Sequence, residues 1–537
     1  MQKTQKDFSI KQRWDGMSRE DKAGLILLLC AIILGALVRL LHVWGLEFPI
    51  NDGGLFYAMA RDLQANGFLI PRVTSYNGGG LPFAYPPLGF YLAGSLETVF
   101  GWDLLGLMRW LPVIFNLLTI PVFYLFSRRL MKDPVKAGIA TLFFALLRPG
   151  YEWLIMGGGL TRSPAMLFSL LSLYLYLMML ESQQRRVRDI ILTAVALALT
   201  ILSHLEIGWF TVYSLALLWF FRGRNRRNFI SSVFIVLGML ILTSSYWTQV
   251  IRYHQIQPFL AGLASGGSIP FLSIFELFYF NFTEELIFPI LATIALVGVI
   301  VSLAKRDYLL PAWLVLNAIL DARSVNRSDV IPAAMLISVG IVDGLYVLIA
   351  KYKQLHDVHR KPKTEGEGIF SRAGILVLYI LCAQVLLTAY LFRPNDPSLK
   401  HVLARGDIQA MEWVGENTPP EASFFVVPSS TWWETDAVGE WFPALAERKA
   451  PLTVQGSEWL PGYRQRIADF KEISAQIASG SFNIQELMKT HPGVNFLYLP
   501  LSLYRDTAEL AVLRAALSEF PLVFSNPDVE IYQLRGN

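Results

Sequence analysis

Long apolar runs, separated by short polar connections, fill most of the chain up to about residue 392. A helix needs about 20 mainly apolar residues to cross a bilayer. Seven runs approach or reach that length: 25–41, 107–126, 163–180, 229–246, 286–303, 330–350 and 375–392. Four shorter runs lie between them, at 137–147, 190–202, 207–221 and 308–320. Length alone would exclude these four.

The distribution of Lys and Arg indicates that the four short runs also cross the membrane. If all eleven runs cross, every second connection is rich in basic residues and the others are nearly free of Lys. The basic connections hold residues 3–22, 128–136, 185–188, 222–227, 305–306 and 351–372. Because basic loops stay on the cytoplasmic side, this pattern predicts a cytoplasmic N-terminus and a non-cytoplasmic tail after Arg393.

The predicted architecture is therefore a polytopic α-helical membrane protein of about eleven transmembrane helices, with a soluble C-terminal α/β domain. Residues 1–392 form the membrane domain, whose first outer loop is 45–103, and residues 393–537 form the extracytoplasmic domain. The tail alternates β-type runs with helical patterns. The β-type runs are 424–427, 494–499 and 530–534, and the helical patterns are 466–477 and 507–517.

Composition agrees with a multi-pass protein of the cell membrane. Hydrophobic residues make up 54% of the chain and the mean hydropathy is +0.43, values too apolar for an ordinary soluble enzyme. The net charge of +4 and the clustering of basic residues between apolar runs argue against a nucleic-acid partner. Cys30 and Cys382 lie inside apolar runs and give no disulfide framework.

Asp52 stands just outside the first apolar run, ahead of residues 55–63, whose apolar positions fall at helical spacing. That spacing predicts a short amphipathic helix lying in the membrane interface. An Asp before a helix is a favoured N-cap, which is one explanation for its presence. The other is chemistry at the membrane surface.

The first outer loop resembles that of a known family. Asp52, then Phe56-Tyr57-Ala58, then a segment at 85–92 that begins Tyr85-Pro86-Pro87, is similar to the first outer loop of the GT-C membrane glycosyltransferases. The resemblance is to the protein O-mannosyltransferase and aminoarabinose-transferase branch. It implies that a sugar moves from a polyprenyl-phosphate donor to a protein, lipid or glycan acceptor on the extracytoplasmic side.

In such enzymes the loop Asp takes the proton of the acceptor hydroxyl, a role that a positioned carboxylate can fill. The resemblance therefore makes Asp52 the expected base, and Tyr85 is expected to contact substrate. Gly53 stands where the family has a second acidic residue. We take Glu152 as a substitute, although it can equally pair with Arg148 or Arg162.

Positive charge for the leaving lipid phosphate has two candidate sources. Arg162 follows the glycines at 157–159, and Ser163-Pro164 resembles a helix start, so an anion site at a helix N-terminus is expected. Alternatively, Arg162 extends to the interface. Arg323 and Arg327 form a second outer basic cluster, which either binds a phosphate or is neutralised by neighbouring acids.

Two further groups remain open. His204, Glu206 and His254 are possible ligands of a divalent cation, though their spacing does not demand one. Trp432 and Trp433 lie in an acidic, Trp-rich part of the tail, where indole faces and carboxylates suit sugar rings. The alternative is that these tryptophans fill a core or seat the tail on the membrane.

Two other functions fit the same pattern. One is a transporter or flippase of lipid-linked glycans, which would place polar residues along a path through the membrane. The other is a non-catalytic glycan-binding membrane protein that uses its tail. A cluster of Asp52, Glu152 and Arg162 on the outer side would favour transfer, and a charged path through the spans would favour transport.

Overall fold

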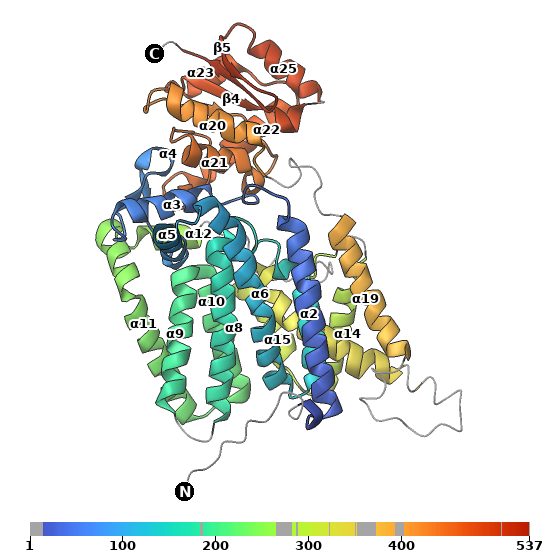
Figure 1. Cartoon of the computed structure of the whole chain (residues 1–537). Helices are drawn as coiled ribbons and strands as arrows, with labels where there is room; N and C mark the ends of the chain where they lie inside the picture. The colour runs from blue at the N-terminus through green and yellow to red at the C-terminus, as the bar shows by residue number, and fades with distance from the viewer. Residues whose placement is uncertain are drawn as a thin grey trace.

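The protein is seen here in a computed structural model, in which a helical bundle carries a smaller α/β domain at one end (Figure 1). The structure describes residues 14–182, 186–264, 282–285, 288–321, 323–348, 351, 372–391, 402–505 and 507–535.

Each of the eleven predicted runs coincides with a helix. The eleven are α2 (Arg19–Val43), α6 (Leu104–Met131), α7 (Pro134–Leu146), α8 (Gly159–Glu181), α9 (Val187–Ser203), α10 (Leu205–Arg222), α11 (Arg226–His254), α14 (Ile290–Ala304), α15 (Leu309–Leu320), α16 (Val325–Val339) and α19 (Arg372–Leu391). A π-helical segment, η2 (Gly340–Leu345), extends α16. Among the described residues, five of these helices are long and apolar enough to cross a membrane: α2, α6, α8, α11 and the segment 325–348.

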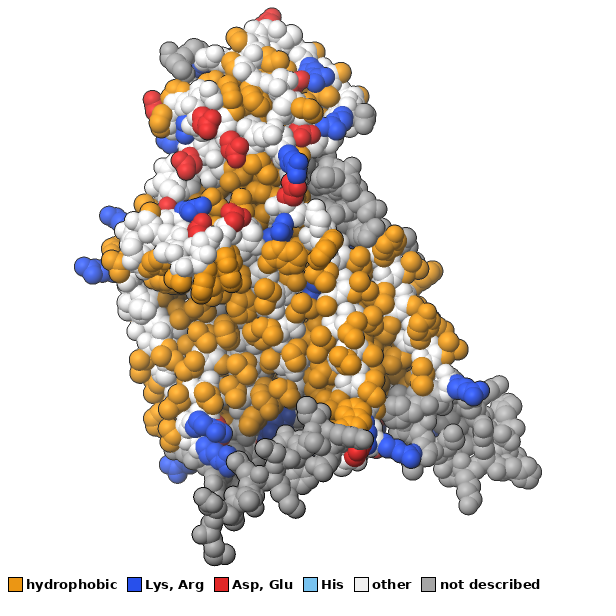
Figure 2. Space-filling view, viewed as in Figure 1, with side chains coloured by type: hydrophobic (Ala, Val, Ile, Leu, Met, Phe, Trp, Pro, Cys, Tyr) orange, Lys and Arg blue, Asp and Glu red, His pale blue; other side chains and the backbone are white. Residues whose placement is uncertain are grey.

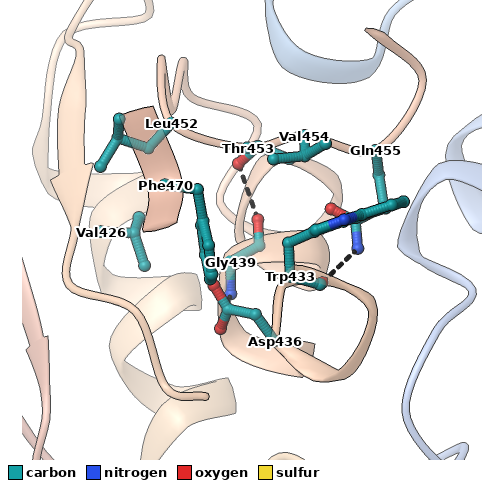
Figure 3. A pocket seen from close by; sticks show the side chains of 9 residues that line it. All are labelled: Val426, Trp433, Asp436, Gly439, Leu452, Thr453, Val454, Gln455 and Phe470. Atoms are coloured by element: carbon teal, nitrogen blue, oxygen red, sulfur yellow. Dashed lines mark hydrogen bonds between the residues drawn. The ribbon is translucent and has the colours of Figure 1, made fainter. Parts of the chain in front are cut away.

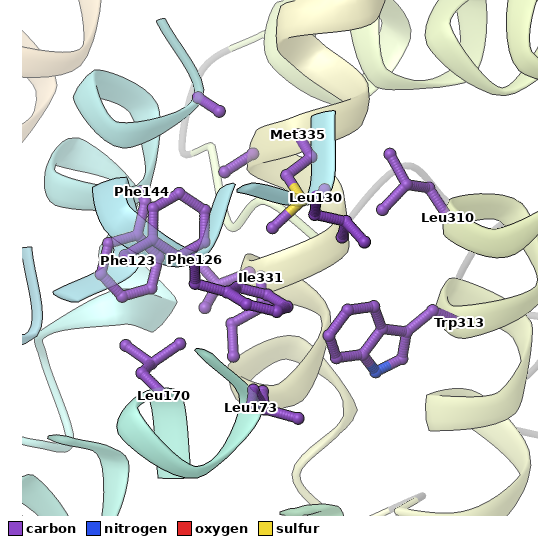
Figure 4. Close-up of a cluster of buried hydrophobic side chains, with 14 of the residues drawn as sticks. Phe123, Phe126, Leu130, Phe144, Leu170, Leu173, Leu310, Trp313, Ile331 and Met335 are labelled. Atoms are coloured by element: carbon purple, nitrogen blue, oxygen red, sulfur yellow. The ribbon is translucent and has the colours of Figure 1, made fainter. Parts of the chain in front are cut away.

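The outer surface of the bundle is apolar. Figure 2 shows hydrophobic side chains covering its middle, while Lys and Arg gather at the end away from the α/β domain. Inside, aromatic and aliphatic side chains from α6, α7, α8, α15 and α16 interlock (Figure 4). Phe123 stacks on Phe144 at 4.1 Å, and the buried Trp313 donates its indole N–H to Ser214 Oγ at 3.0 Å. A buried indole N–H usually finds a hydrogen-bond partner of this kind.

The first outer loop is folded on the end of the bundle. It contains α3 (Gly54–Ala65), β1 (Val73–Thr74), α4 (Tyr76–Gly79), β2 (Leu81–Pro82) and α5 (Leu88–Phe100). The predicted amphipathic helix is confirmed as α3, but its apolar side chains are buried against protein, in one core with α5 and the tail. The connection between α11 and α14 contains α12 (Gln257–Ala264), and its residues 265–281 lie outside the described residues.

The C-terminal domain is a four-stranded sheet with helices around it. Its sheet order is β3 (Phe424–Val426), β4 (Phe496–Pro500), β6 (Val529–Gln533), β5 (Leu522–Ser525); β3 and β4 are parallel and the other pairs antiparallel. The surrounding helical segments are α20 (Arg405–Asn417), η3 (Trp433–Thr435), α21 (Ala437–Leu445), η4 (Ser457–Trp459), α22 (Tyr463–Ala478), α23 (Ile484–Thr490), α24 (Leu501–Tyr504) and α25 (Ala508–Ala516).

The three predicted strands and the two predicted helices of this domain are confirmed. The sequence missed β5, because an edge strand of four residues is too short to show a clear period. It also missed α20 and α21. The expected boundary between 392 and 393 lies outside the described residues, so the division of the chain there stays a prediction. Helix α21 is the element of the tail that packs on α3 (Figure 1).

Candidate active site

Asp52 lies where the first outer loop, the start of α8 and the tail meet. The backbone on both sides of it has positive φ, 54° at Asn51 and 132° at Gly53. A side chain disfavours the first of these conformations, and the second is nearly restricted to glycine. The sequence Asn-Asp-Gly therefore permits a sharp turn at Asp52, in the segment that follows α2.

The Asp52 carboxylate binds the first turn of α8. Its Oδ1 accepts the backbone N–H of Gly158 at 2.9 Å, and its Oδ2 forms an ion pair with Arg162. Both side chains are largely buried, with 13% and 14% of their areas exposed. The N-cap of α3 is Gly53, with no side-chain capping bond, so Asp52 does not cap that helix.

Helix α8 begins earlier than expected. The predicted start at Ser163-Pro164 is wrong: the helix starts at Gly159 and Pro164 lies inside it. The turn before it can pack so closely because it has no side chains, since a Cβ added at Gly157 would overlap the carbonyl oxygen of Asp52. At this helix end the anionic group is the Asp52 carboxylate of the protein itself.

Arg162 points inward to Asp52. A second guanidinium nitrogen donates to the carbonyl oxygen of Trp153 at 3.0 Å, and the group lies 5.7 Å from the centre of the Trp153 ring. The structure thus brings Asp52 and Arg162 together. Glu152 takes its alternative partner, forming an ion pair with Arg148 at 2.6 Å.

A carboxyl group from the tail stands beside Asp52. Glu440, on α21, is only 4% exposed, and its Oε1 accepts the backbone N–H of Gly53 at 2.8 Å. Burial raises the pKa of Glu440 to about 8, and the nearby Asp52 carboxylate adds to the rise. Glu440 belongs to the acidic, Trp-rich part of the tail, and no local pattern links it to Asp52, because nearly four hundred residues separate the two.

Helix α21 and the segment before it hold the loop at several further points. The indole N–H of Trp441 donates to the carbonyl oxygen of Asn51 at 2.8 Å, and the Asn51 amide donates to the carbonyl oxygen of Glu434 at 2.9 Å. The hydroxyl of Tyr76 donates to the carbonyl oxygen of Glu440 at 2.6 Å. Trp441 is fully buried, so it is a packing residue, as the alternative for the tail tryptophans allowed.

Tyr85 belongs to an aromatic cluster on the α8 side of the site. Its ring lies 4.6 Å from that of Phe56 and 5.9 Å from that of Trp459. Its hydroxyl is 3.5 Å from Thr161 Oγ1. Burial raises the pKa of Tyr85 to about 12, so it stays a neutral hydrogen-bonding group at physiological pH.

The second basic cluster lies at the outer ends of α10 and α16. Arg327 forms an ion pair with Glu206 at 2.5 Å, which is the neutralisation that the sequence left open. Arg323 lies close enough to act electrostatically on Glu458 and Tyr463 in the tail. The cluster therefore faces the tail domain.

The three candidate ligands of a cation have separate partners. His204 caps α10, Glu206 pairs with Arg327, and His254 Nε2 donates to the carbonyl oxygen of Arg72 at 2.6 Å. Within the described part of the chain, no three His, Cys, Asp or Glu side chains are grouped as a metal site.

The remaining tail tryptophans have different environments. Trp432 is 66% exposed. Trp433 is half-buried and lies edge-on to Tyr463, with ring centres 6.2 Å apart. It lines a small pocket of the tail together with Asp436, Gln455 and neighbouring side chains (Figure 3). Aromatic and polar groups thus face one another at the edge of the tail.

Comparison with solved structures identifies the architecture. The archaeal oligosaccharyltransferase AglB from Archaeoglobus fulgidus, in complex with an inhibitory peptide and a dolichol-phosphate, has a TM-score of 0.55 at 15% identity, over 91% of this chain and 70% of its own. ArnT from Cupriavidus metallidurans in the apo state gives 0.53 at 13% identity, over 95% and 97% of the two chains. The chain has the GT-C fold.

The GT-C fold extends over the tail in these comparisons. The arabinofuranosyltransferase AftD from Mycobacteria has a TM-score of 0.57 at 14% identity, over 97% of this chain and 40% of its own. A family described as a 6-pyruvoyl-tetrahydropterin synthase related domain, membrane protein, matches residues 84–253. Those residues run from the end of the first outer loop through α11 and carry Glu152 and Arg162 but not Asp52. No curated protein matches the sequence.

Proposed function

We propose that this protein is a membrane glycosyltransferase that moves a sugar from a polyprenyl-phosphate donor to an acceptor, with Asp52 as the base. The proposal places the bundle in the cell membrane and the tail on its extracytoplasmic side. The observation that carries it is the position of Asp52. Its carboxylate caps no helix of its own loop and is held against the start of α8 by Arg162 and Gly158, beneath the tail.

The proposed reaction uses these groups as follows. The acceptor hydroxyl attacks the anomeric carbon, its proton passes to Asp52, and the bond between that carbon and the phosphate oxygen breaks. Polyprenyl phosphate leaves as an anion. Although both Asp52 oxygens already accept a hydrogen bond, each carboxylate oxygen has a second lone pair that can take a proton.

Arg162 is the proposed partner of the leaving phosphate, since it is the cation next to Asp52 and sits in the first turn of α8. Electrostatic stabilisation of the developing negative charge is the usual role of such a group. Arg323 and Arg327 are proposed to line the donor site beside the tail, and Tyr85 to form its aromatic wall. Glu152 keeps a supporting catalytic role as a prediction, through Arg148 rather than by direct contact with Asp52.

Structural neighbours support the proposal in general terms. Two of them are named as an oligosaccharyltransferase and an arabinofuranosyltransferase, and one holds a dolichol-phosphate. These names describe enzymes that transfer sugars. At such low identity the neighbours do not identify the sugar. The acceptor of the present chain can be a protein, a lipid or a glycan.

Asp52→Asn tests the proposal. The amide oxygen can still accept the Gly158 N–H, but the side chain cannot take a proton at neutral pH, so transfer should fall by roughly 10²–10⁴-fold. The measurement is mass spectrometry of products formed by the full-length protein in lipid vesicles, from a panel of polyprenyl-phosphate pentoses and hexoses offered with native membrane acceptors.

Asp62→Asn is the matched control. Asp62 lies in the same loop, on α3, and its carboxylate accepts a backbone N–H from Ser75 at 2.8 Å. This control should keep wild-type transfer. Wild-type turnover by Asp52→Asn would remove Asp52 as the base, and no transfer by the wild-type protein from any donor would argue against the function itself.

A further inference from the structure

The tail contacts the turn that carries Asp52 at the residue before Asp52 and at the residue after it. Asn51 and Gly53 adopt positive φ values of 54° and 132°. Backbone conformations of this kind are sparsely populated and persist only where their surroundings hold them. Here one helix of the tail contacts the backbone on both sides of Asp52.

Helix α21 supplies the holding contacts. Trp441 binds the carbonyl oxygen of Asn51 at 2.8 Å, and Glu440 binds the N–H of Gly53 at 2.8 Å. The approach is close, because a Cβ added at Gly54 would lie 2.5 Å from the carbonyl oxygen of Glu440. Asp52 is therefore the residue between two backbone groups that α21 fixes.

Glu440 places a titratable group where a neutral amide could accept the same N–H. It is only 4% exposed, so its ionised form carries the cost of burying a charge. The charged and titratable groups around it come from four elements: Asp52 on the loop, Arg162 on α8, Glu458 on η4 and Tyr76 on α4. The protonation of Glu440 therefore depends on the charges of the proposed site.

We propose that Glu440 is a positioning residue for the transfer reaction: by holding Gly53, it sets the Asp52 carboxylate against the start of α8, so that the tail domain is part of the transfer site. The inference rests on the proposed role of Asp52 as the base. It adds that this base is correctly placed only when α21 is docked.

Because Glu440 is titratable, the proposal also predicts how turnover depends on pH. Burial and the Asp52 charge raise the pKa of Glu440 to about 8, so the group is protonated at neutral pH. As pH rises through about 8, Glu440 loses its proton and a second negative charge appears beside Asp52. Turnover of the wild-type protein should therefore fall above about pH 8.

Two variants of the full-length protein test this. Glu440→Ala removes the acceptor for the Gly53 N–H, and Glu440→Gln keeps an acceptor oxygen but cannot ionise. Glu412→Ala, an exposed acid on α20 of the same domain, is the matched control. Each is measured by hydrogen exchange of the peptide covering residues 48–60, and by kcat and KM for sugar transfer from the polyprenyl-phosphate panel.

We expect Glu440→Ala to lose exchange protection in 48–60 while strand β4 stays protected, with kcat lower by on the order of 10²-fold and the donor KM unchanged. Glu440→Gln should keep protection and neutral-pH turnover, and should lack the fall above pH 8. Glu412→Ala should behave as wild type in both measurements.

Three results would overturn the inference: wild-type protection in Glu440→Ala, lost protection with unchanged kcat, or a fall above pH 8 that persists in Glu440→Gln. Failure of the proposed function has a different pattern. In that case Asp52→Asn keeps its activity or no donor is used, while the exchange of 48–60 still shows whether Glu440 holds the loop.

Discussion

At the residue scale, the site depends on glycines as much as on charged side chains. Gly157 donates its N–H to the carbonyl oxygen of Ile50 at 2.9 Å, and an added Cβ there would overlap the carbonyl oxygen of Asp52. Main chain packs directly on main chain at this point. The Asp52 carboxylate reaches the start of α8 only because no side chain separates the two segments.

Gly157→Ala should therefore disable the site without changing any charged group. The methyl group must push Asp52 away from Gly158 and Arg162, and a displacement of about 1 Å can cost on the order of 10²-fold in rate. Transfer in lipid vesicles measures the effect. Gly80→Ala is the control in the same loop, because its Cβ would meet no atom within 4 Å; equal losses in both variants would contradict the packing argument.

At the scale of elements, α3 and α21 form the joint between the loop and the tail. The period of apolar residues predicted α3, and its apolar face was expected to lie in the membrane interface. That face packs instead with α5 and with tail residues such as Trp441 and Phe442. An amphipathic pattern gives the helix and its apolar side, but not which surface covers that side.

The segment before α21 carries an exposed aromatic side chain, Trp432. Trp432 has 66% of its surface exposed, so Trp432→Ala leaves no cavity in a core. If the tail holds the acceptor, this variant and Trp432→Ala/Trp433→Ala should raise the acceptor KM, with each lost aromatic contact costing about 0.5–1.5 kcal/mol.

Donor binding should stay unchanged in both variants, and hydrogen exchange of the strands in the tail should show that the domain remains folded. Unchanged acceptor kinetics in a folded double variant would remove these two residues from the site. Trp441→Ala would not be informative, because Trp441 is buried and its loss would also disturb the loop.

At the scale of the whole molecule, an apolar belt separates a basic end from the end that carries the tail (Figure 2). The basic end holds Lys and Arg from the connections after α6, α8, α10 and α14. The proposed site lies at the opposite end, with the first outer loop and the tail. From the positive-inside rule we therefore expect the site on the non-cytoplasmic face.

An orientation experiment checks this placement. A single cysteine introduced at the exposed Glu412, in a background without Cys30 and Cys382, should react with a membrane-impermeant maleimide in intact cells. A cysteine at Arg224, between α10 and α11, should react only after the membrane is opened. The reverse pattern would invert the protein and place the site in the cytoplasm.

Residue chemistry and period alone determined much of this protein. The eleven apolar runs predict helices because a segment that crosses lipid must bond its backbone groups within itself. Asp52 became a candidate through the resemblance of its loop to a known family, and Arg162 through its place after a turn of glycines. Three strands and two helices of the tail followed from their periods.

Tertiary structure decided the partners. Glu152 had two possible cations and the fold gave it Arg148, while Asp52 received Arg162. Glu440 reaches Asp52 only because the tail folds back over the loop, and a contact between residues so far apart leaves no local pattern in the sequence. The reason is physical: periodicity records which face of an element is apolar, whereas the groups that meet across elements depend on how the whole chain packs.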